Sequence, residues 1–424
     1  MMAPEETTMV AKLAAMEASA AGLLLLAMAC GGTGTSSSIV TGGTGGGGTT
    51  AGGSLSLGAG AGGGGGGAGG HAGSAGLGGT ATTTRGGETT QGGQGMQGGT
   101  GGSSASTDPC PDGQVDCNGA CVAEGSTMPG CTVLATAGEG VDIALGMALD
   151  ADYVYWSEEG NHIAIARAPK AGGQRQELVE CDDIPYEVNV NSTLVAWTEG
   201  GFQRQRVRVM AKTGGTPTDL LDEMSTDAFE SSALSETRVY FMHGHFGMAG
   251  DIQSVGITGK DLLTHGTTAS SFRTDIALTA DTVYWASNDF FNKQLIKQDT
   301  LTGTTESALA EIPQINRMKV SGPNAYAIAG YSGQQKVQQV ALTSGNVSDL
   351  YTGAEVDGSV FAAAGTSVYF GSASALYELA GGATKPTKLL ETKSGIGFVV
   401  ADDSGVYVAL NHANFGQGFV VKVK

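Results

Sequence analysis

The chain has 424 residues, 71 of them glycine, and only 15% of its residues are charged. Asp and Glu outnumber Lys and Arg by 41 to 22, giving a net charge of −19. This balance argues against a nucleic-acid partner, because phosphate binding requires clustered Lys and Arg. Nearly half of the glycines lie in residues 31–109. The remaining sequence therefore keeps enough apolar side chains for a sizeable core.

An apolar segment at residues 18–29 ends at Cys30. The segment is too short to span a bilayer core of ~30 Å as a helix, and its small terminal residues are typical of a secretory signal. Ala27-Met28-Ala29-Cys30 resembles the lipobox of bacterial lipoproteins. The resemblance implies a lipoprotein signal peptide over 1–29, lipidation of Cys30, and a membrane anchor in the bacterial cell envelope, at the outer membrane. A conventional signal peptide with an incidental Cys is the alternative.

Residues 30–109 are rich in Gly, Ser and Thr and contain few side chains that a core could bury. Such a segment cannot offset the entropy of ordering, so we expect a disordered linker. No apolar run in the whole chain reaches 18 residues, which excludes a membrane-embedded transporter built from helices.

Four cysteines follow the linker: Cys110, Cys117, Cys121 and Cys131. In an exported chain this spacing indicates two disulfides, with three possible pairings. A zinc site is the competing interpretation, but only Cys117 and Cys121 have a typical zinc-ligand spacing and no His accompanies them. We therefore predict a disulfide-bonded collar over 110–130. Cys181 is left over, as a buried thiol or an unpaired surface thiol.

One tripeptide recurs about every 43 residues from residue 131 to the end. Its copies are VYW 154–156, VAW 195–197, VYF 239–241, VYW 283–285, AYA 325–327, VYF 368–370 and VYV 406–408. All three Trp of the chain occupy the third position of this repeat. Each unit has four short alternating segments separated by Gly, Asp and Asn turns, which are strand and turn signals.

Four strands per unit predict an all-β fold, a seven-bladed β-propeller over 131–424, with six blades as the alternative. The seventh unit lacks a fourth strand, and residues 131–136 match the missing one. We expect this segment to pair with residues 418–424 and close the ring. The motifs VYWSE (154–158) and VYWAS (283–287) resemble those of YWTD-type and TolB-like propellers, which implies the same fold class.

Because strands in a blade alternate in direction, the variable second-to-third loops and the blade crossovers share one face. Binding residues concentrate on such loops, so this face is the predicted binding surface. Its crossovers are acidic, and its candidate binding residues are Phe202, Phe246, Phe290, Phe291, Tyr331, Phe415, His162, His243, His245 and His412.

Linear catalytic motifs are missing from the body, and His243 with His245 would need a further ligand to hold a metal. We therefore predict no metal or cofactor, and a monomeric, non-catalytic protein that binds an extracellular protein or carbohydrate. The alternative is an extracytoplasmic hydrolase or lyase with its active site at the propeller channel mouth. Convergent His, Asp and Arg at that mouth would favour the enzyme.

Overall fold

The computed structural model describes residues 110–424 except for 112, 139, 144, 202, 226, 245–247, 269–274, 288–293, 332 and 412–416. The predicted signal peptide, Cys30 and the glycine-rich linker lie outside the described residues. Within the described part of the chain, no helix is long and apolar enough to cross a membrane.

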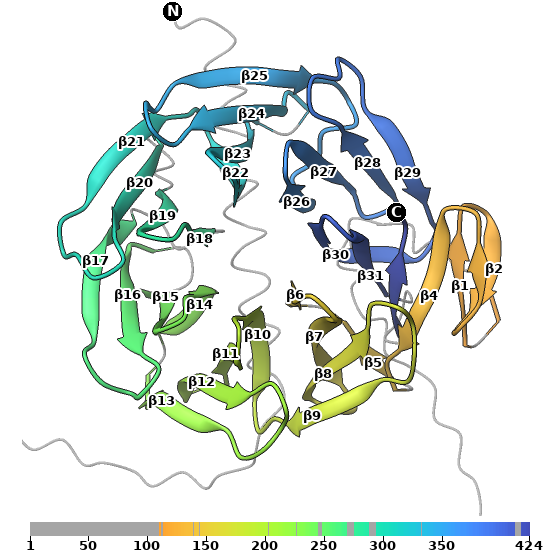
Figure 1. The fold of residues 1–424 in the computed structure, drawn as a ribbon, viewed down its shortest axis with the longest axis horizontal. Helices are drawn as coiled ribbons and strands as arrows, with labels where there is room; N and C mark the ends of the chain where they lie inside the picture. The colour runs from red at the N-terminus through yellow and green to blue at the C-terminus, as the bar shows by residue number, and fades with distance from the viewer. Residues whose placement is uncertain are drawn as a thin grey trace, which may run out of the picture. The chain divides into compact units, whose positions relative to one another are not determined.

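The strands form seven sheets arranged as blades around a central channel (Figure 1). Blade 1 contains β5 (Val141–Asp142), β6 (Met147–Leu149), β7 (Tyr153–Gly160), β8 (Ala164–Pro169) and β9 (Gln176–Glu180). Blade 2 contains β10 (Ile184–Val190), β11 (Leu194–Gly200), β12 (Gln205–Ala211) and β13 (Thr218–Glu223). Blade 3 contains β14 (Ala228–Leu234), β15 (Arg238–Gly244), β16 (Gly250–Gly256) and β17 (Leu263–Thr268).

The other four blades repeat this pattern. Blade 4 contains β18 (Ile276–Leu278), β19 (Thr282–Ser287), β20 (Leu295–Thr300) and β21 (Ser307–Glu311). Blade 5 contains β22 (Ile315–Ser321), β23 (Asn324–Ala329), β24 (Lys336–Ala341) and β25 (Val347–Thr352). Blade 6 contains β26 (Val360–Ala364), β27 (Ser367–Ser372), β28 (Ala375–Leu379) and β29 (Thr387–Glu391). Blade 7 contains β30 (Gly395–Asp402), β31 (Gly405–Asn411), β32 (Gly418–Lys422), β4 (Cys131–Thr136) and β3 (Thr127–Met128).

The prediction of seven blades rather than six is confirmed. Each copy of the repeated tripeptide lies on the second strand of its blade, where Trp156, Trp197 and Trp285 have no exposed surface. These large side chains fill the space between neighbouring blades, and burying each contributes about 3 kcal/mol or less.

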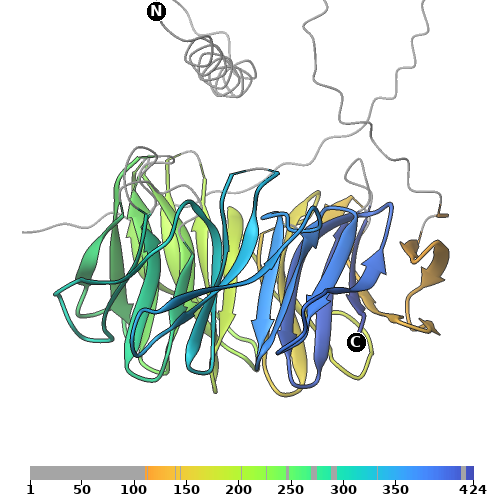
Figure 2. The ribbon, with the colours of Figure 1, turned by 90° about the horizontal axis from the view of Figure 1, so that it is seen from above.

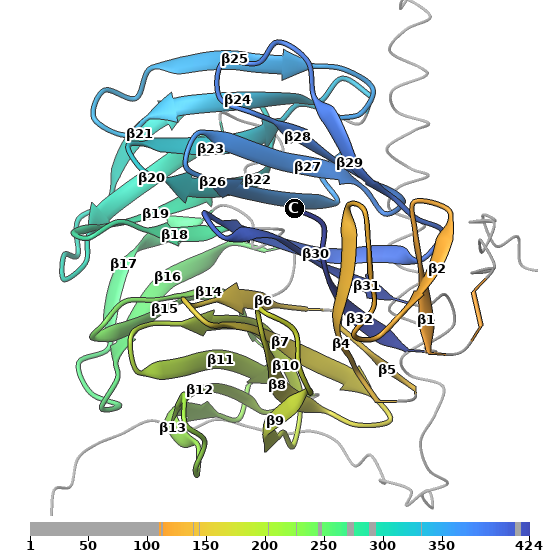
Figure 3. The same cartoon turned by 45° about the vertical axis from the view of Figure 1, so that its right-hand side comes forward.

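The ring closes as predicted. β32 pairs antiparallel with β4, with Phe419 opposite Thr136 and Lys422 opposite Thr132 (Figure 3). The two ends of the body thereby build one blade, and β32 is not left as an open edge.

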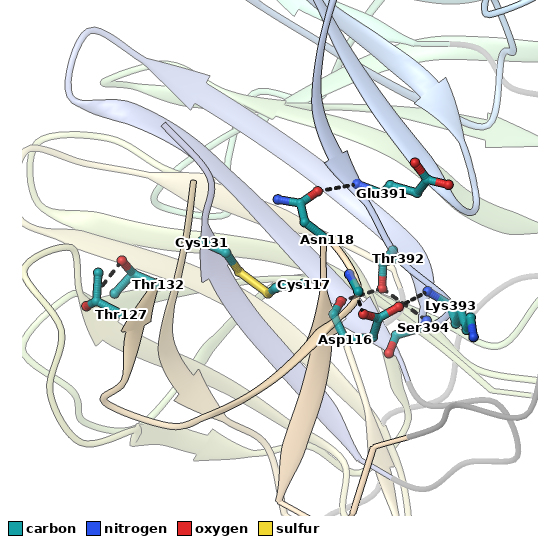
Figure 4. Close-up of a disulfide and its surroundings, with 11 residues drawn as sticks. Asp116, Cys117, Asn118, Thr127, Cys131, Thr132, Glu391, Thr392, Lys393 and Ser394 are labelled. Atoms are coloured by element: carbon teal, nitrogen blue, oxygen red, sulfur yellow. Dashed lines mark hydrogen bonds between the residues drawn. A yellow bond between two sulfur atoms is a disulfide. The ribbon is translucent and has the colours of Figure 1, made fainter. Parts of the chain in front are cut away.

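The collar is a hairpin of β1 (Gln114–Cys117) and β2 (Ala120–Ala123) that packs against blades 6 and 7. Val115 and Cys117 share one apolar cluster with Leu390 of blade 6 and Val133 of blade 7. Asp116 accepts hydrogen bonds from Thr392 Oγ1 (2.6 Å, through its carbonyl) and from the Lys393 N–H (2.8 Å, through its carboxylate), as Figure 4 shows. The collar is therefore part of the folded body.

Two disulfides are formed, and their pairing is Cys110–Cys121 and Cys117–Cys131. The second bond joins the end of β1 to the start of β4, the strand that closes the ring (Figure 4). Cys181 is free and buried.

Two predicted strands differ from the structure. In blade 3 the segment DLLTH (261–265) predicts the fourth strand, which in the structure spans Leu263–Thr268, after Asp261 with a φ of +59°. In blade 1 the alternating segment 142–150 predicts one continuous first strand, but the structure divides it into β5 and β6. The break includes Gly146, where an added Cβ would sit 2.5 Å from the backbone nitrogen of Val188. Only glycine allows blade 2 to approach this closely.

Candidate functional site

The blade strands run across the thickness of the ring, so the connections gather on two faces (Figure 2). We name the side with first-to-second and third-to-fourth turns the turn face. The side with second-to-third loops and blade crossovers is the loop face. The first strand of each blade lines the central channel (Figure 1), and these seven inner strands are β6, β10, β14, β18, β22, β26 and β30.

Three of the ten predicted binding residues lie in the described part of the chain, and each is on a different blade. Tyr331 is 68% exposed on the loop face of blade 5. His162 of blade 1 binds Glu177 at 2.8 Å. His243 of blade 3 is partly buried. The other seven lie outside the described residues: Phe202, Phe246, Phe290, Phe291, Phe415, His245 and His412.

His243 lies in a pocket of about 350 Å³ above blade 3. Its ring packs edge-on against Phe229, with 5.0 Å between the ring centroids. Its Nε2 lies 3.6 Å from a Glu223 carboxylate oxygen and 3.8 Å from one of Asp227, and no described residue forms a hydrogen bond with this nitrogen. Met248 lines the same pocket and is 61% exposed.

Exposed apolar side chains favour the loop face. Met224, Met248 and Tyr331 lie there with exposed fractions of 76%, 61% and 68%. Among the described residues, the other exposed large hydrophobic side chains are Leu262, in a third-to-fourth turn, and Val347, on an outer strand. The loop face therefore offers adaptable apolar contacts beside the acidic crossovers.

Many of the acidic crossover residues already have partners. Arg206, only 2% exposed, binds Asp182 at 2.9 Å and Asp183 at 3.0 Å. Arg204 binds Asp222 through two nitrogens, at 2.6 and 2.7 Å. Hydrogen bonds from these arginines lower the pKa of Asp182 and of Asp222. Asp182, Asp183 and Asp222 remain ionised, but Arg204 and Arg206 neutralise their negative charge locally.

The central channel contains a cavity of about 430 Å³ to which all seven inner strands contribute. The apolar residues of its wall are Met147, Ala148, Leu149, Val188, Val190, Ile276, Ala362, Ala363, Phe398, Val399, Val400 and Ala401. The polar groups are Asp150 and Asp402 toward the turn face, and Glu187, Asn189, Ser232 and Lys319 deeper in the channel.

A charged cluster stands at the deep end of the channel. Asp275 accepts hydrogen bonds from the backbone N–H of Met318 (2.5 Å) and from Arg317 Nε (3.2 Å), and its other oxygen lies 4.0 Å from Lys319 Nζ. Asp275 is buried, and its charge raises the pKa of Arg317. Burial raises the pKa of Glu187, an effect that nearby Lys319 partly opposes.

Glu187 occupies a β-bulge between Tyr186 and Asn189 with a φ of +34°. A left-handed conformation costs a residue with a Cβ roughly 1–2 kcal/mol. The bulge is fixed by packing against Gly146 and by a hydrogen bond from the Glu187 N–H to the Leu145 carbonyl at 3.2 Å. Bulges re-aim side chains, and here the re-aimed side chain belongs to the channel lining.

A Ser–His–Asp array lies between blades 3 and 4. Ser254 Oγ is 2.8 Å from His265 Nε2, and His265 Nδ1 is 3.2 Å from an Asp299 carboxylate oxygen. Ser254 has no exposed surface, and its hydroxyl also accepts a hydrogen bond from Arg238 Nε at 2.9 Å. A substrate cannot reach this hydroxyl in the folded protein. The array therefore joins two blades and is not a nucleophile.

Metal and thiol chemistry find no support in the described part of the chain. No group of three or more His, Cys, Asp or Glu side chains there is arranged to hold a metal ion. Burial, reinforced by the neighbouring Glu199 carboxylate, raises the pKa of the Cys181 thiol far above its ordinary value. A protonated, buried thiol is a poor nucleophile.

No motif or repeat position in the sequence marks Glu187, Asp275, Arg317 or Lys319. The available signal was charge on inner-strand segments, since NRMKVS (316–321) carries two cations and IPYEVNV (184–190) carries a Glu. No motif marks the ion pairs at the turn-face end of the channel either. There Asp150 binds Lys212 at 2.7 Å, and Asp402 binds Lys170.

No protein-family model and no curated protein matches the chain. Similar solved structures are propellers. The structure of YCF48 bound to D1 peptide matches 71% of this chain and 98% of its own at 11% identity, with a TM-score of 0.51. The WD40 propeller domain of Doa1 matches 70% and 98% at 11% identity (TM-score 0.49), and TolB from Acinetobacter baumannii matches 61% and 59% at 12% identity (TM-score 0.40). The chain thus spans less than two thirds of that TolB. The likeness to YCF48 supports the β-propeller fold and nothing beyond it.

Proposed function

We propose that the chain is an exported, lipid-anchored protein whose propeller binds a protein ligand through its loop face. The observation that carries the binding role is the exposure of Met224, Met248 and Tyr331 on that face, where Met248 also lines the pocket of His243. Flexible Met side chains adapt to protein surfaces, and the acidic crossovers suit a partner with basic residues. YCF48, which shares the fold, was solved with a bound peptide.

Export and anchoring rest on two independent observations. The segment ending in Ala27-Met28-Ala29-Cys30 resembles a lipobox, and the folded body contains two disulfides, which persist in oxidising compartments. We expect palmitate labelling of the expressed protein and its loss in Cys30→Ala. Labelling that survives this substitution would remove the anchor from the proposal.

The binding role is tested with a triple variant, Met224→Ser, Met248→Ser and Tyr331→Ser. Wild type and variant are immobilised, and the envelope and secreted proteins of the producing cell that each retains are compared. The matched control is Leu262→Ser with Val347→Ser, which removes the exposed apolar side chains elsewhere. A protein retained by wild type and control should be lost by the triple variant. Purified partner should then bind the triple variant at least about 10-fold more weakly in surface plasmon resonance.

Equal affinity of the purified partner for wild type and the triple variant would contradict the loop-face role. Binding to a glycan array that depends on the same three residues would replace the protein ligand with a carbohydrate. Carbohydrate is the less favoured ligand, because sugars stack on aromatic rings and Tyr331 alone among these three residues provides one.

A further inference from the structure

We propose that a groove between the collar and blade 6 binds an extended segment of the partner protein that carries a Lys or Arg side chain. The inference rests on the proposed protein-binding role and adds where, and by which chemistry, the partner is held. The groove has a volume of about 970 Å³, against about 430 Å³ for the channel cavity. We name it the collar groove.

The residues that line the collar groove lie in four segments. These are 116–119 of the collar, 354–357 of the crossover from blade 5 to blade 6, 372–377 of blade 6, and 388–393 at the end of blade 6. Only two residues connect β27 to β28, fewer than join the second and third strands of any other blade. Blade 6 therefore has no long loop to fill the space beside the collar.

The collar side of the groove is fixed in the folded protein. The Asn118 N–H donates to the Glu391 carbonyl at 2.8 Å, and Asn118 Oδ1 accepts a hydrogen bond from the Glu391 N–H at 2.8 Å (Figure 4). Asp116 accepts hydrogen bonds from Thr392 and Lys393 immediately beyond. A groove held in this way loses little conformational entropy when a partner enters.

The groove opens along the edge of a sheet. β29 is the outermost strand of blade 6, and an edge strand presents unpaired backbone N–H and C=O groups. Asn118 already uses this edge by binding both backbone groups of Glu391. Lys388 and Leu389 precede Glu391 on the same strand and line the groove. An extended peptide can continue the backbone pairing there, as peptides do at other exposed sheet edges.

Two carboxylates of the groove lack a positive partner. Glu355 accepts a hydrogen bond from the Tyr351 hydroxyl at 2.8 Å, and Asp357 accepts from the N–H and the hydroxyl of Ser359 at 2.9 and 2.5 Å. These neutral donors orient the carboxylates and leave both charges in place. No Lys or Arg in the described part of the chain forms an ion pair with either, unlike the arginine-paired carboxylates at blade 2.

The charge of the groove selects the ligand. Its lining contains four acidic residues and two lysines, and one of those lysines, Lys388, is paired with Glu391 at 2.8 Å. A partner segment with a Lys or Arg side chain supplies the counter-charge that Glu355 and Asp357 lack, whereas an acidic segment is repelled. The sheet edge thus favours an extended backbone, and the carboxylates favour a basic side chain upon it.

The test begins with a phage-displayed library of random heptapeptides, panned on the immobilised full chain. Recovered peptides are synthesised and titrated by fluorescence polarisation. We expect at least one peptide containing Lys or Arg to bind with a Kd below about 100 μM. Replacing its basic residues with norleucine should weaken binding at least about 10-fold, and so should the double variant Glu355→Gln with Asp357→Asn.

The matched control is Asp152→Asn with Asp281→Asn. It removes the same charge from two exposed first-to-second turns on the turn face, so it should leave the affinity unchanged. The norleucine comparison uses the unaltered protein and remains decisive should the Glu355→Gln, Asp357→Asn variant fail to fold.

The proposal is overturned when no peptide is recovered, when the norleucine peptides bind equally well, or when the folded double variant binds with unchanged affinity. Dimerisation of the chain that this variant abolishes would assign the groove to a second copy and would also overturn it. A protein that loses affinity for the triple variant of Met224, Met248 and Tyr331 but not for the groove variant would contradict this inference alone and leave the proposed function standing.

Discussion

Blades 1, 2 and 7 share one four-strand pattern. They differ in the third residue of the repeated tripeptide on the second strand and in the residue two positions after it. In blade 2 the Trp197 indole donates to Glu199 at 2.9 Å, and Arg208 and Arg206 bind that carboxylate at 3.0 and 2.6 Å. Blade 1 repeats this with Trp156, Glu158 and Arg175. Residues two apart on a strand share a face, so the Glu satisfies the indole N–H above it.

Blade 7 has Val408 and Leu410 at the two corresponding positions, and both are fully buried. Without an indole N–H there is no need for a buried carboxylate or its arginines. This blade is stabilised by a continuous apolar cluster shared with the collar and by the disulfide to β4. The comparison shows that one strand pattern accommodates either a satisfied ionic network or an apolar core with a covalent bond.

The strongest test of this contrast is Glu199→Ala. The substitution removes the buried carboxylate that Arg206, Arg208 and the Trp197 indole share, and leaves the indole N–H without its acceptor, so we expect the free energy of unfolding to fall by about 3 kcal/mol. The measurement is urea denaturation, with Arg204→Ala as control, because the Arg204–Asp222 pair is solvent-exposed and should contribute almost nothing. A loss for Glu199→Ala no greater than for the control would contradict a structural role for the buried network.

The second test removes the covalent bond at the closure. Replacing Cys117 and Cys131 with Ser opens a loop with a sequence separation of 14, and we expect a loss of about 3 kcal/mol. Replacing both Cys110 and Cys121 with Ser should lower the stability of the propeller less, because that bond lies within the collar. Equal effects of the two double variants in thermal unfolding would show that the bond to β4 has no special part in ring closure.

The smallest effect is expected from the polar link between blades 3 and 4. Burial lowers the pKa of His265 below its ordinary value of 6.5, so the folded protein disfavours the charged ring. Its contribution to stability is therefore complete above pH 6.5 and is lost as pH falls below that value toward the lowered folded-state pKa. Denaturation from pH 7 to pH 5 should show a decline that His265→Gln reduces. An identical decline in both proteins would assign it to other groups.

His243 occupies in blade 3 the position that Glu158 and Glu199 occupy in blades 1 and 2, two residues after the repeated aromatic. Phe241 has no N–H to satisfy, and His243 instead packs against Phe229 with its Nε2 near two carboxylates. The position that holds a stabilising Glu in blades 1 and 2 therefore holds a pocket-lining His in blade 3.

The sequence by itself determined the seven blades, the pairing of the two ends and the disulfide-bonded state of the collar cysteines. These follow from local information: a repeat of fixed period, alternation of apolar side chains, and turn residues at each strand end. Strand limits were predicted less well where a close approach between blades intervened, as at Gly146.

Only the tertiary structure decided which polar groups meet. Glu187, Asp275 and Lys319 come from three different blades and converge because the ring curves until their inner strands face one channel. The packing of the collar on blades 6 and 7 likewise places Asp116 beside Lys393 and Cys117 beside Cys131. A repeat period sets contacts within a blade and between neighbours, whereas contacts across the ring depend on the summed rotation of all seven blades.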